Sequence, residues 1–527
     1  RRQLTTTHTS TMQRIIHTIL YIVLATFLVA TASACKRKAQ IPENAATTDS
    51  TLAIYPDYKD VTIPPNIAPL NFMATFEAQD YVASLTGEDG QEIVVGSIEG
   101  GKFIIDADEW KKLLQANKGK SITITVYAKQ EGTWIKFAPF KMHVANEDID
   151  AYLSYRLIEP SYELYRQLGL YQRNLTNFDE YPIYENNRNF DMAHNHCINC
   201  HNFQNYDTDR MLFHVRAEHG GTIFYDHGNI KKMNMRADSV LANCVYPTWH
   251  PTRNWVVFSS NLTGQAFHMT NLNKIEVIDY GSDLVFYDAD KGSLTNILKT
   301  NVDMETFPCW SPDGKRLYYC SAHFEPLTNA ADSTRSDSVL RYYDKVFYDI
   351  MSMDFDEKTR TFGQPRMEVN CSAMKMSATV PRISPDGRYL LFTMGGYGQF
   401  HIWHKDSDLW IKDLKTGDLY PLSEANSPEV DSYHTWSSNG RWIVFSSRRE
   451  DKNFSRPAIA YFDKDGKPHK AFILPQEDPE YHQLFFKSYN VPELTKSAVK
   501  TTPEQLKKVV YDDASAGKVS YTAKPTK

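Results

Sequence analysis

A strand-forming pattern of hydrophobic positions recurs four times in the second half of the chain. Each copy has two residues before a Trp or Ile, then Ser-Pro or a related pair, an Asp-Gly-like turn, and a β-branched and aromatic strand. The copies are residues 246–260, 307–321, 380–394 and 433–447. Further strand pairs around Asp/Lys-x-Gly turns, such as 284–298 and 409–422, lie between the copies. About four strands per repeat is typical of a β-propeller, in which no blade can bury both faces alone.

The repeat resembles that of the TolB family, whose signature is W-S-P-D-G followed by a hydrophobic strand. The equivalent positions Trp249, Trp310, Ile383 and Trp436 lie 61, 73 and 53 residues apart, and we expect them in the core. The resemblance covers about residues 197–476 and implies an all-β, TolB-like propeller of about six blades. A divergent blade is expected over 197–236. We place the propeller at 197–490 and a C-terminal tail at 491–527, although 148–196 and 477–527 could together supply a sixth blade.

The segment before the repeats has a different pattern. Residues 51–147 alternate or run β-branched between turn-rich pieces, which predicts a small β-sandwich module. Its one helical piece spans 106–120, with Asp106 or Asp108 as the cap and Gly119 as the stop. Residues 148–196 are dense in tyrosine and are interpreted as a linker that packs on the propeller.

Composition narrows the function classes. Of the 527 residues, 42% are hydrophobic and 23% charged, which is ordinary for a folded protein. The net charge of -6 gives no basic surplus, so we expect no nucleic-acid partner. A single apolar stretch, 15–30, excludes a polytopic membrane protein.

The N-terminal segment predicts a cell-envelope address. Met12 looks like the start, and a basic residue, the apolar run and the small residues before Cys35 form a signal peptide over 1–34. Cys35 after Ala-Ser-Ala resembles the lipidated cysteine of bacterial lipoproteins, which implies a membrane anchor facing the periplasm. Residues 35–50 would be a flexible tether. The alternative is a secreted protein in which Cys35 is incidental.

The chemistry-bearing motif is Cys197-Ile198-Asn199-Cys200-His201. C-x-x-C-H is the attachment motif of c-type haem: the thiols of Cys197 and Cys200 form thioethers with the vinyl groups, and His201 binds the iron. Haem attachment takes place outside the cytoplasm, in agreement with the signal peptide. A Cys197–Cys200 disulfide, half of a zinc site and a thioredoxin-like pair are the alternatives.

A second axial iron ligand is harder to choose. His250 replaces the Ser of the W-S-P-D-G repeat and is the first candidate, followed by His214 and then His268. The methionines in reach are Met192, Met211 and Met269, whereas His194 and His196 lie too close to the motif.

TolB-like lipoproteins with one such motif resemble a group common in the Bacteroidetes, and this resemblance covers most of residues 50–495. This resemblance implies a location in the cell envelope and a bound haem, but it does not indicate a substrate. No G-x-S-x-G, H-E-x-x-H or phosphate-loop motif is present, which argues against the hydrolases that also carry propellers. Two functions remain. One is a mono-haem electron-transfer protein with an unknown redox or envelope protein partner. The other is a protein-binding or envelope-assembly propeller in which the haem is structural or sensory.

Overall fold

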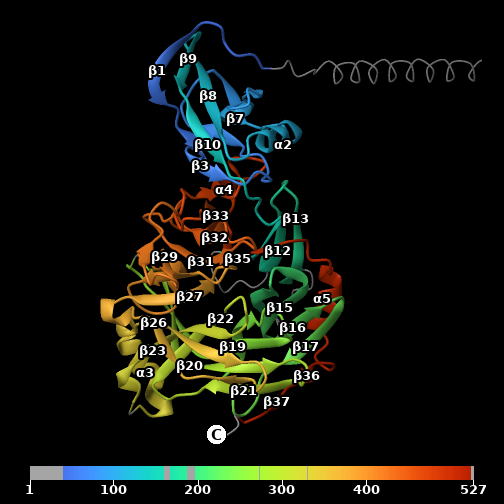
Figure 1. The fold of residues 1–527 in the computed structure, drawn as a ribbon, viewed down its shortest axis with the longest axis vertical. Coiled ribbons are helices and arrows are strands. Elements are labelled where there is room, and N and C mark those ends of the chain that lie inside the picture. The colour runs from blue at the N-terminus through green and yellow to red at the C-terminus, as the bar shows by residue number, and fades with distance from the viewer. Residues whose placement is uncertain (1–38, 160–166, 187–195, 272, 329, 524–527) are drawn as a thin grey trace, which may run out of the picture.

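The computed structural model describes residues 39–523, apart from 160–166, 187–195, 272 and 329. Two parts are visible in Figure 1: a small N-terminal module and a larger β-propeller below it. Cys35 and the predicted signal peptide lie outside the described residues. Within the described part of the chain, no helix combines the length and the hydropathy needed to cross a bilayer.

The N-terminal module contains two sheets and a helix, as the sequence predicts. The larger sheet consists of β1 (Ala45–Thr51), β3 (Val61–Ile63), β5 (Asp80–Gly87), β6 (Glu92–Gly96), β8 (Ser121–Gln130), β9 (Thr133–Ala138) and β10 (Phe140–Val144). The smaller sheet consists of β2 (Ile54–Tyr55), β4 (Phe72–Ala74) and β7 (Lys102–Phe103). Helix α2 (Ala107–Ala116) is capped by the Asp106 carboxylate, which accepts from the amides of Asp108 and Glu109. The flexible tether predicted over 35–50 ends before Ala45, because Ala45–Thr51 form strand β1, which pairs with β9.

Six four- or five-stranded sheets form the propeller, and we number these blades in chain order. Blade one is β11 (Tyr152–Ile158), β12 (Gly169–Asn174), β13 (Glu180–Glu185) and β35 (Ser488–Thr495). Blade two is β14 (His196–Gln204), β15 (Asp207–Ala217), β16 (Gly221–Asp226), β17 (Asn229–Asn234) and β36 (Gly517–Lys518). Blade three is β18 (Cys244–Trp249), β19 (Trp255–Phe267), β20 (Ile275–Asp288), β21 (Ser293–Leu298) and β37 (Ser520–Tyr521).

The remaining blades follow the four-copy repeat. Blade four is β22 (Asp303–Trp310), β23 (Arg316–His323), β24 (Asp349–Asp356), β25 (Thr361–Phe362) and β26 (Arg366–Val369). Blade five is β27 (Ser377–Ile383), β28 (Tyr389–Gly395), β29 (Asp408–Asp413) and β30 (Leu419–Pro421). Blade six is β31 (Asp431–Trp436), β32 (Trp442–Ser447), β33 (Arg456–Tyr461) and β34 (Phe472–Ile473). Short helices α3 (Arg335–Arg341), α4 (Tyr481–Leu484) and α5 (Pro503–Val510) lie outside these sheets.

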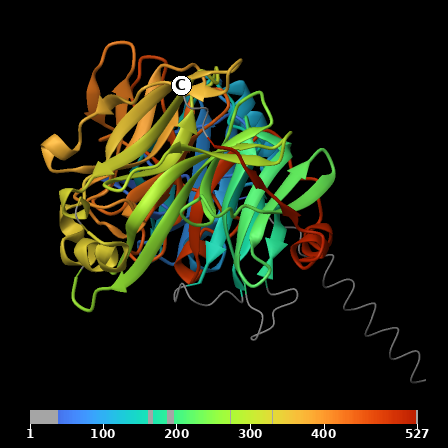
Figure 2. The ribbon, with the colours of Figure 1, turned by 90° about the horizontal axis from the view of Figure 1, so that it is seen from below.

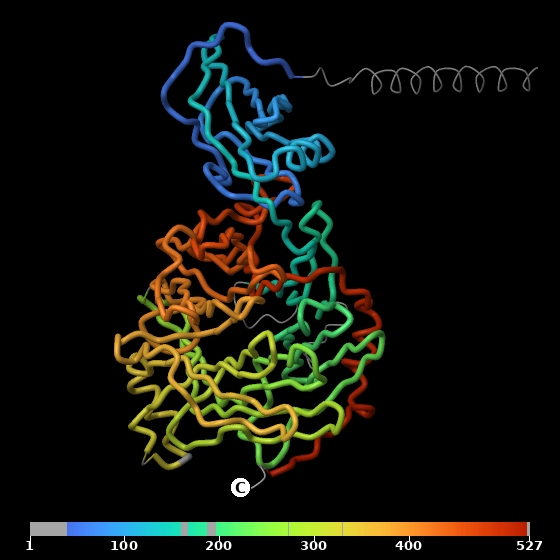
Figure 3. The backbone as a smooth tube through the Cα atoms, in the orientation of Figure 1, coloured from blue at the N-terminus to red at the C-terminus, as the bar shows by residue number. Residues whose placement is uncertain are grey.

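The ring is closed by a strand from the C-terminal region. Strand β35 pairs antiparallel with β11, so that Leu157 lies opposite Tyr489 and Leu153 opposite Leu494. The segment interpreted as a linker, 148–196, therefore supplies three strands of blade one. The segment interpreted as a tail, 491–527, supplies the end of β35, then α5, β36 and β37. Figure 3 shows this red segment running along the green blades.

The repeat tryptophans are core residues, as predicted. Trp310 and Trp436 are 6% and 2% exposed, and the indole nitrogen of Trp436 donates to the carbonyl of Arg382, 3.2 Å away. Trp310 contacts the rings of His250 and Phe355. These aromatic side chains fill the space between neighbouring sheets, which is what holds the blades in a ring.

The module packs on blade six. The Trp442 indole donates to the carbonyl of Glu147 at 3.2 Å, and the Tyr461 hydroxyl donates to its carboxylate at 2.8 Å. Viewed from below, the propeller lies in front of the blue strands of the module (Figure 2). Buried residues of β3 and β8 share one hydrophobic cluster with β32 and β33.

Candidate functional site: the axial cavity

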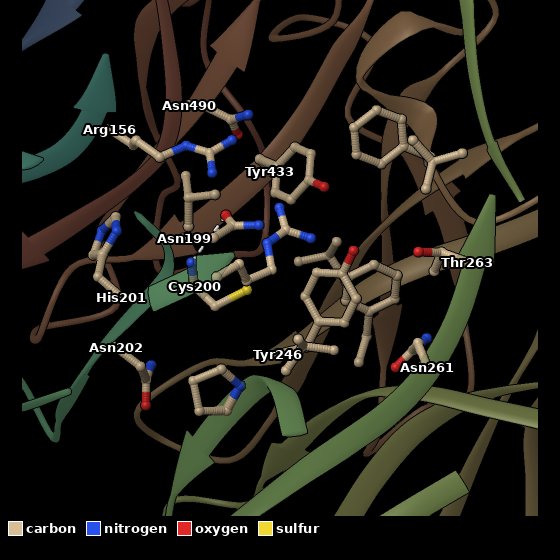
Figure 4. A pocket seen from close by; sticks show the side chains of 18 of the residues that line it. Arg156, Asn199, Cys200, His201, Asn202, Tyr246, Asn261, Thr263, Tyr433 and Asn490 are labelled. Atoms are coloured by element: carbon tan, nitrogen blue, oxygen red, sulfur yellow. Dashed lines mark hydrogen bonds between the residues drawn. The ribbon is translucent and has the colours of Figure 1, made fainter. Parts of the chain in front are cut away.

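A cavity of about 650 Å³ lies where the six innermost strands meet. Residues of β14, β18, β22, β27, β31 and β35 all line it, and its wall extends to β11, β15, β19 and β20. Figure 4 shows side chains from several of these strands facing this space. The centre of a propeller is where ligand cavities form, because the blades taper toward the axis.

Every innermost strand carries one residue in the left-handed region, with φ between 46° and 54°. The six residues are Cys200, Tyr246, Phe307, Val380, Tyr433 and Val491. The pairing register of each strand shifts at this point, so each is a bulge. Bulges re-aim side chains. A β-branched residue such as Val380 adopts this conformation only where the surrounding fold enforces it.

The bulges extend the repeat from four copies to six. The residue that follows the bulge is proline in four blades and histidine in two, namely His201 and His434. The sequence analysis missed the copies at 200–203 and 491–494. The signal was present as a four-residue unit: a bulge residue, Pro or His, any residue, and a large hydrophobic residue.

Cys197 and Cys200 both line the cavity from β14. They are 5% and 7% exposed and both are free thiols. In a regular strand, residues three apart face opposite sides, but the bulge at Cys200 changes the alternation. Burial raises the pKa of the Cys200 thiol. The guanidinium Nη2 of Arg216 lies 3.9 Å from the Cys197 sulfur.

His201 is buried beside the cysteines and also lines the cavity. Neither of its ring nitrogens makes a hydrogen bond to a described residue. The nearest carboxylate is Glu493, whose Oε2 is 3.9 Å from Nε2. Burial, together with the charge of Arg156, lowers the pKa of His201 to about 3. The imidazole is therefore neutral near pH 7, with a free lone pair.

The structure does not bring His250 to this cavity. Its backbone carbonyl accepts from Gln204 of β14 at 2.6 Å, but its ring faces blade four. There Nε2 lies 3.2 Å from the carbonyl of Gly314, and Nδ1 accepts from the amides of Thr252 and Arg253. The rings of Trp255 and Trp310 flank it. The first sequence candidate for a second axial ligand is thus a hydrogen-bonded residue between two blades.

The other axial candidates are also placed away from the lining. His214 lies on β15 opposite Asn199, with Nδ1 3.3 Å from the Thr222 hydroxyl. His268 binds Glu276 through Nε2 at 3.1 Å. Met211 is buried in the hydrophobic cluster that also contains Cys197 but does not line the cavity, and Met269 is 95% exposed. Met192 and His194 lie outside the described residues.

The cavity contains a second imidazole that the sequence analysis missed. His434 stands at the repeat position of His201, in blade six, and lines the cavity. Its Nδ1 is 3.3 Å from the Thr393 hydroxyl, while Nε2 has no hydrogen-bond partner among the described residues. Burial lowers its pKa to about 3.

The geometry of Cys197 and Cys200 bears on three alternatives to haem attachment: a disulfide, half of a zinc site and a thioredoxin-like pair. Cys197 and Cys200 are not joined in a disulfide. Among the residues that the structure describes, no three His, Cys, Asp or Glu side chains converge as ligands of one metal ion. A single zinc ion needs such convergence. Haem c does not, because the cysteine thiols bond to vinyl groups at the edge of the haem ring and not to the iron. The motif lies on a strand of a propeller and not in a βαβ unit.

Fold and site together define a six-bladed β-propeller with a cysteine- and arginine-lined axial cavity. No family model matches the chain. It is 26% identical over 160 residues to the uncharacterized protein Atu1656 of Agrobacterium fabrum, which covers 29% of this chain and 43% of that protein. The chain thus spans less than half the length of this relative.

Among solved structures, the chain is similar to the tricorn protease with a TM-score of 0.33 and 9% identity, covering 78% of this chain and 43% of that one. It is also similar to a prolyl endopeptidase, with a TM-score of 0.34 and 12% identity, covering 61% and 42%.

Proposed function

We propose that this protein is a cell-envelope β-propeller that carries one haem c in its axial cavity. Cys197 and Cys200 would hold the group as thioethers and His201 would be the proximal iron ligand. One observation carries the proposal: two free thiols and a buried imidazole without a hydrogen bond line the same cavity. When bound, the group supplies one-electron transfer.

The residues present fit such a group in their chemistry. The thiols are close to Arg216 and are not engaged with each other. His201 is neutral and held by packing between β14 and the neighbouring β35. The tyrosines Tyr246 and Tyr433 and the amide of Asn490 complete a polar, sheltered wall (Figure 4). Of the imidazoles in the lining, His434 is the candidate for the second axial position.

The test is covalent haem content. The protein is expressed with a working cytochrome c maturation system and examined by intact mass and a pyridine haemochrome spectrum. We expect one haem per chain, and reduced or lost retention in Cys197→Ala and Cys200→Ala. Cys244→Ala is the matched control, because Cys244 is equally buried but lies in another cluster. Haem-free wild-type protein with a Cys197–Cys200 disulfide would overturn the proposal.

The axial ligands are tested separately. His201→Ala should keep the thioethers but change the visible spectrum, because the iron loses its proximal donor. His434→Ala should convert six-coordinate low-spin iron toward high-spin iron that binds carbon monoxide. His214→Ala and His250→Ala, which alter residues outside the lining, should leave the spectrum unchanged. A changed spectrum in either would return the second axial ligand to that residue.

A second candidate function rests on the repeat. Cys200-His201 occupies the position that Tyr433-His434 occupies in blade six, so the second half of the motif also follows from blade architecture. This favours the alternative of a binding or envelope-assembly propeller in which haem is structural or sensory. An exposed haem edge with two strong axial ligands supports electron transfer to a redox partner; an open sixth position, detected by carbon monoxide binding, supports sensing.

The location is part of the proposal. Cys35 would be lipidated and would anchor the chain to a membrane, with the propeller in the periplasm. Cys35→Ser should release the protein from the membrane fraction. Unchanged association with membranes in that variant would contradict the anchor.

A further inference from the structure

Three arginines from three blades line the axial cavity: Arg156 of β11, Arg216 of β15 and Arg382 of β27. Arg156 donates from Nη1 to the carbonyl of Ile198 in the motif at 3.0 Å, and its buried Nε has no hydrogen-bond partner in the described chain. Arg382 donates from Nη1 to the carbonyl of Pro381 at 2.9 Å. These contacts orient the side chains but do not neutralise them.

None of the three arginines forms an ion pair with a described residue, in contrast to several arginines elsewhere in the propeller. Arg316 and Arg366 share Asp354, and Arg388 binds Asp413. The cavity arginines therefore carry charges that the described protein does not compensate. Arg156 and Arg382 are half-buried, whereas Arg216 is exposed. Half-buried charges are normally paired, because desolvation without a counter-charge is costly.

The lining offers one acidic side chain among its described residues, Glu493. Its Oε1 accepts from the backbone amide of Phe203 at 3.1 Å, and among the described residues it forms no ion pair with a lining arginine. Burial lowers the pKa of Arg156, and the nearby charge of Arg216 acts in the same direction. The site is thus locally cationic, although the whole chain has a net charge of -6.

Neutral donors accompany the arginines. The carboxamides of Asn199 and Asn243 and the hydroxyls of Tyr246 and Tyr433 line the same space, whereas the Nδ2 of Asn261 already donates to Asp279 and Thr306. Burial raises the pKa of both tyrosines, which keeps their hydroxyls as donors. Guanidinium groups match carboxylates with two parallel hydrogen bonds, and hydroxyl and amide donors add single ones.

We infer that the axial cavity binds carboxylate groups through Arg156, Arg216 and Arg382. The carboxylates have two sources. They are the propionates of the haem, in which case the inference rests on the proposed function, or they belong to a free small dicarboxylate. The position of Arg216 beside Cys197 places the arginine site next to the attachment residues.

The first experiment tests the site without haem. Cys197→Ser/Cys200→Ser protein is titrated with succinate, and its melting temperature is followed; succinamide is the uncharged control ligand. We expect a saturable rise with succinate and none with succinamide. Added to this background, Arg156→Gln or Arg216→Gln should weaken the apparent affinity about tenfold or more, as expected for the loss of a charge-assisted hydrogen bond.

Matched variants separate binding from general effects. Arg366→Gln on the exposed strand β26 removes a guanidinium away from the cavity and should leave the succinate response unchanged. It also controls for the general stabilisation of folded proteins by excluded anions. Arg216→Lys keeps the charge but not the paired donors, and should give an intermediate response even if Arg216→Gln folds poorly.

The second experiment uses haem-loaded protein. Arg216→Gln should keep the covalent haem but lower the reduction potential, because removing a positive charge near the iron favours the oxidised form. Arg366→Gln should leave the reduction potential unchanged. A lowered potential without a succinate response supports the inference and identifies the propionates as the ligand.

Failure of the inference and failure of the haem proposal give different results. If the wild-type protein is haem-free and shows an arginine-dependent succinate response, the haem proposal is refuted. The result would then support a free carboxylate as the ligand of the arginines. Haem attached normally, with both the potential and the succinate response unchanged in Arg156→Gln and Arg216→Gln, would overturn the carboxylate site and leave the haem in place.

Discussion

His201 and His434 occupy the same position of the blade repeat, four blades apart in chain order. Each directly follows a left-handed residue, Cys200 or Tyr433, where the other four blades have proline. Both imidazoles are buried, and burial lowers the pKa of each to about 3. The histidine of the haem-like motif is therefore held by the architecture of its blade, whereas Cys197, three residues before the bulge, has no cysteine counterpart in the other blades.

Trp436 should be one of the most sensitive core positions. Trp436→Ala removes a side chain that is 2% exposed and a hydrogen bond to the carbonyl of Arg382, so we expect a loss of about 3–5 kcal/mol in the free energy of unfolding. Urea denaturation measures it. Tyr181→Ala, at a residue that is 52% exposed, is the control; equal losses in both variants would contradict the interblade role.

We expect His250 to contribute to the stability of the propeller and not to bind a cofactor. His250→Ala removes a ring that packs against Trp255 and Trp310 and binds the carbonyl of Gly314, so we expect a loss of about 2–4 kcal/mol. Gly314 has φ 69°, and a Cβ there would lie 2.3 Å from the His250 Nε2. Gly314→Ala should therefore destabilise the same contact. A melting temperature equal to wild type in both variants would refute this.

Ring closure depends on β35. A chain ending at residue 487 lacks the strand that pairs with β11, and should fail to give a cooperative unfolding transition. A chain ending at residue 496 keeps β35 and loses α5, whose Leu506 and Val510 are buried, so it should remain folded at reduced stability. Circular dichroism melting compares the two. Equal melting of both chains would show that closure does not rest on β35.

Glu305 should make stability fall as the pH rises. Burial, with Asp283 and Asp303 nearby, raises its pKa from 4.5 to about 8. The folded protein thus holds a proton that the unfolded chain has released, and stability is lost between pH 4.5 and about 8, with a slope of up to about 1.4 kcal/mol per pH unit. Glu305→Gln should flatten this decline in denaturation curves recorded across that range.

Glu424→Gln is the control for this prediction, because its side chain is exposed and forms no ion pair with a described residue. It should reproduce the wild-type pH profile. A Glu305→Gln profile that matches the wild type as well would show that Glu305 is ionised in the folded state.

The sequence by itself determined the propeller and its core. The spacing of Trp249, Trp310, Ile383 and Trp436 depends on local strand and turn chemistry, which a linear pattern records directly. The cap of α2 at Asp106 was equally readable. The attachment motif was visible because its five residues are contiguous.

Only the tertiary structure decided which residues share the axial cavity. His250 looked close to the motif because it follows a repeat strand, but its ring turns toward Gly314 in the next blade. Arg156, Arg216 and Arg382 are as much as 226 residues apart in the sequence, and only the closed ring brings them to one space. The inner strand of blade one arrives late in the chain, because β35 pairs with β11 more than 300 residues earlier. Such long-range pairings leave no local signal, because the free energy that selects them comes from burial and from closing the ring.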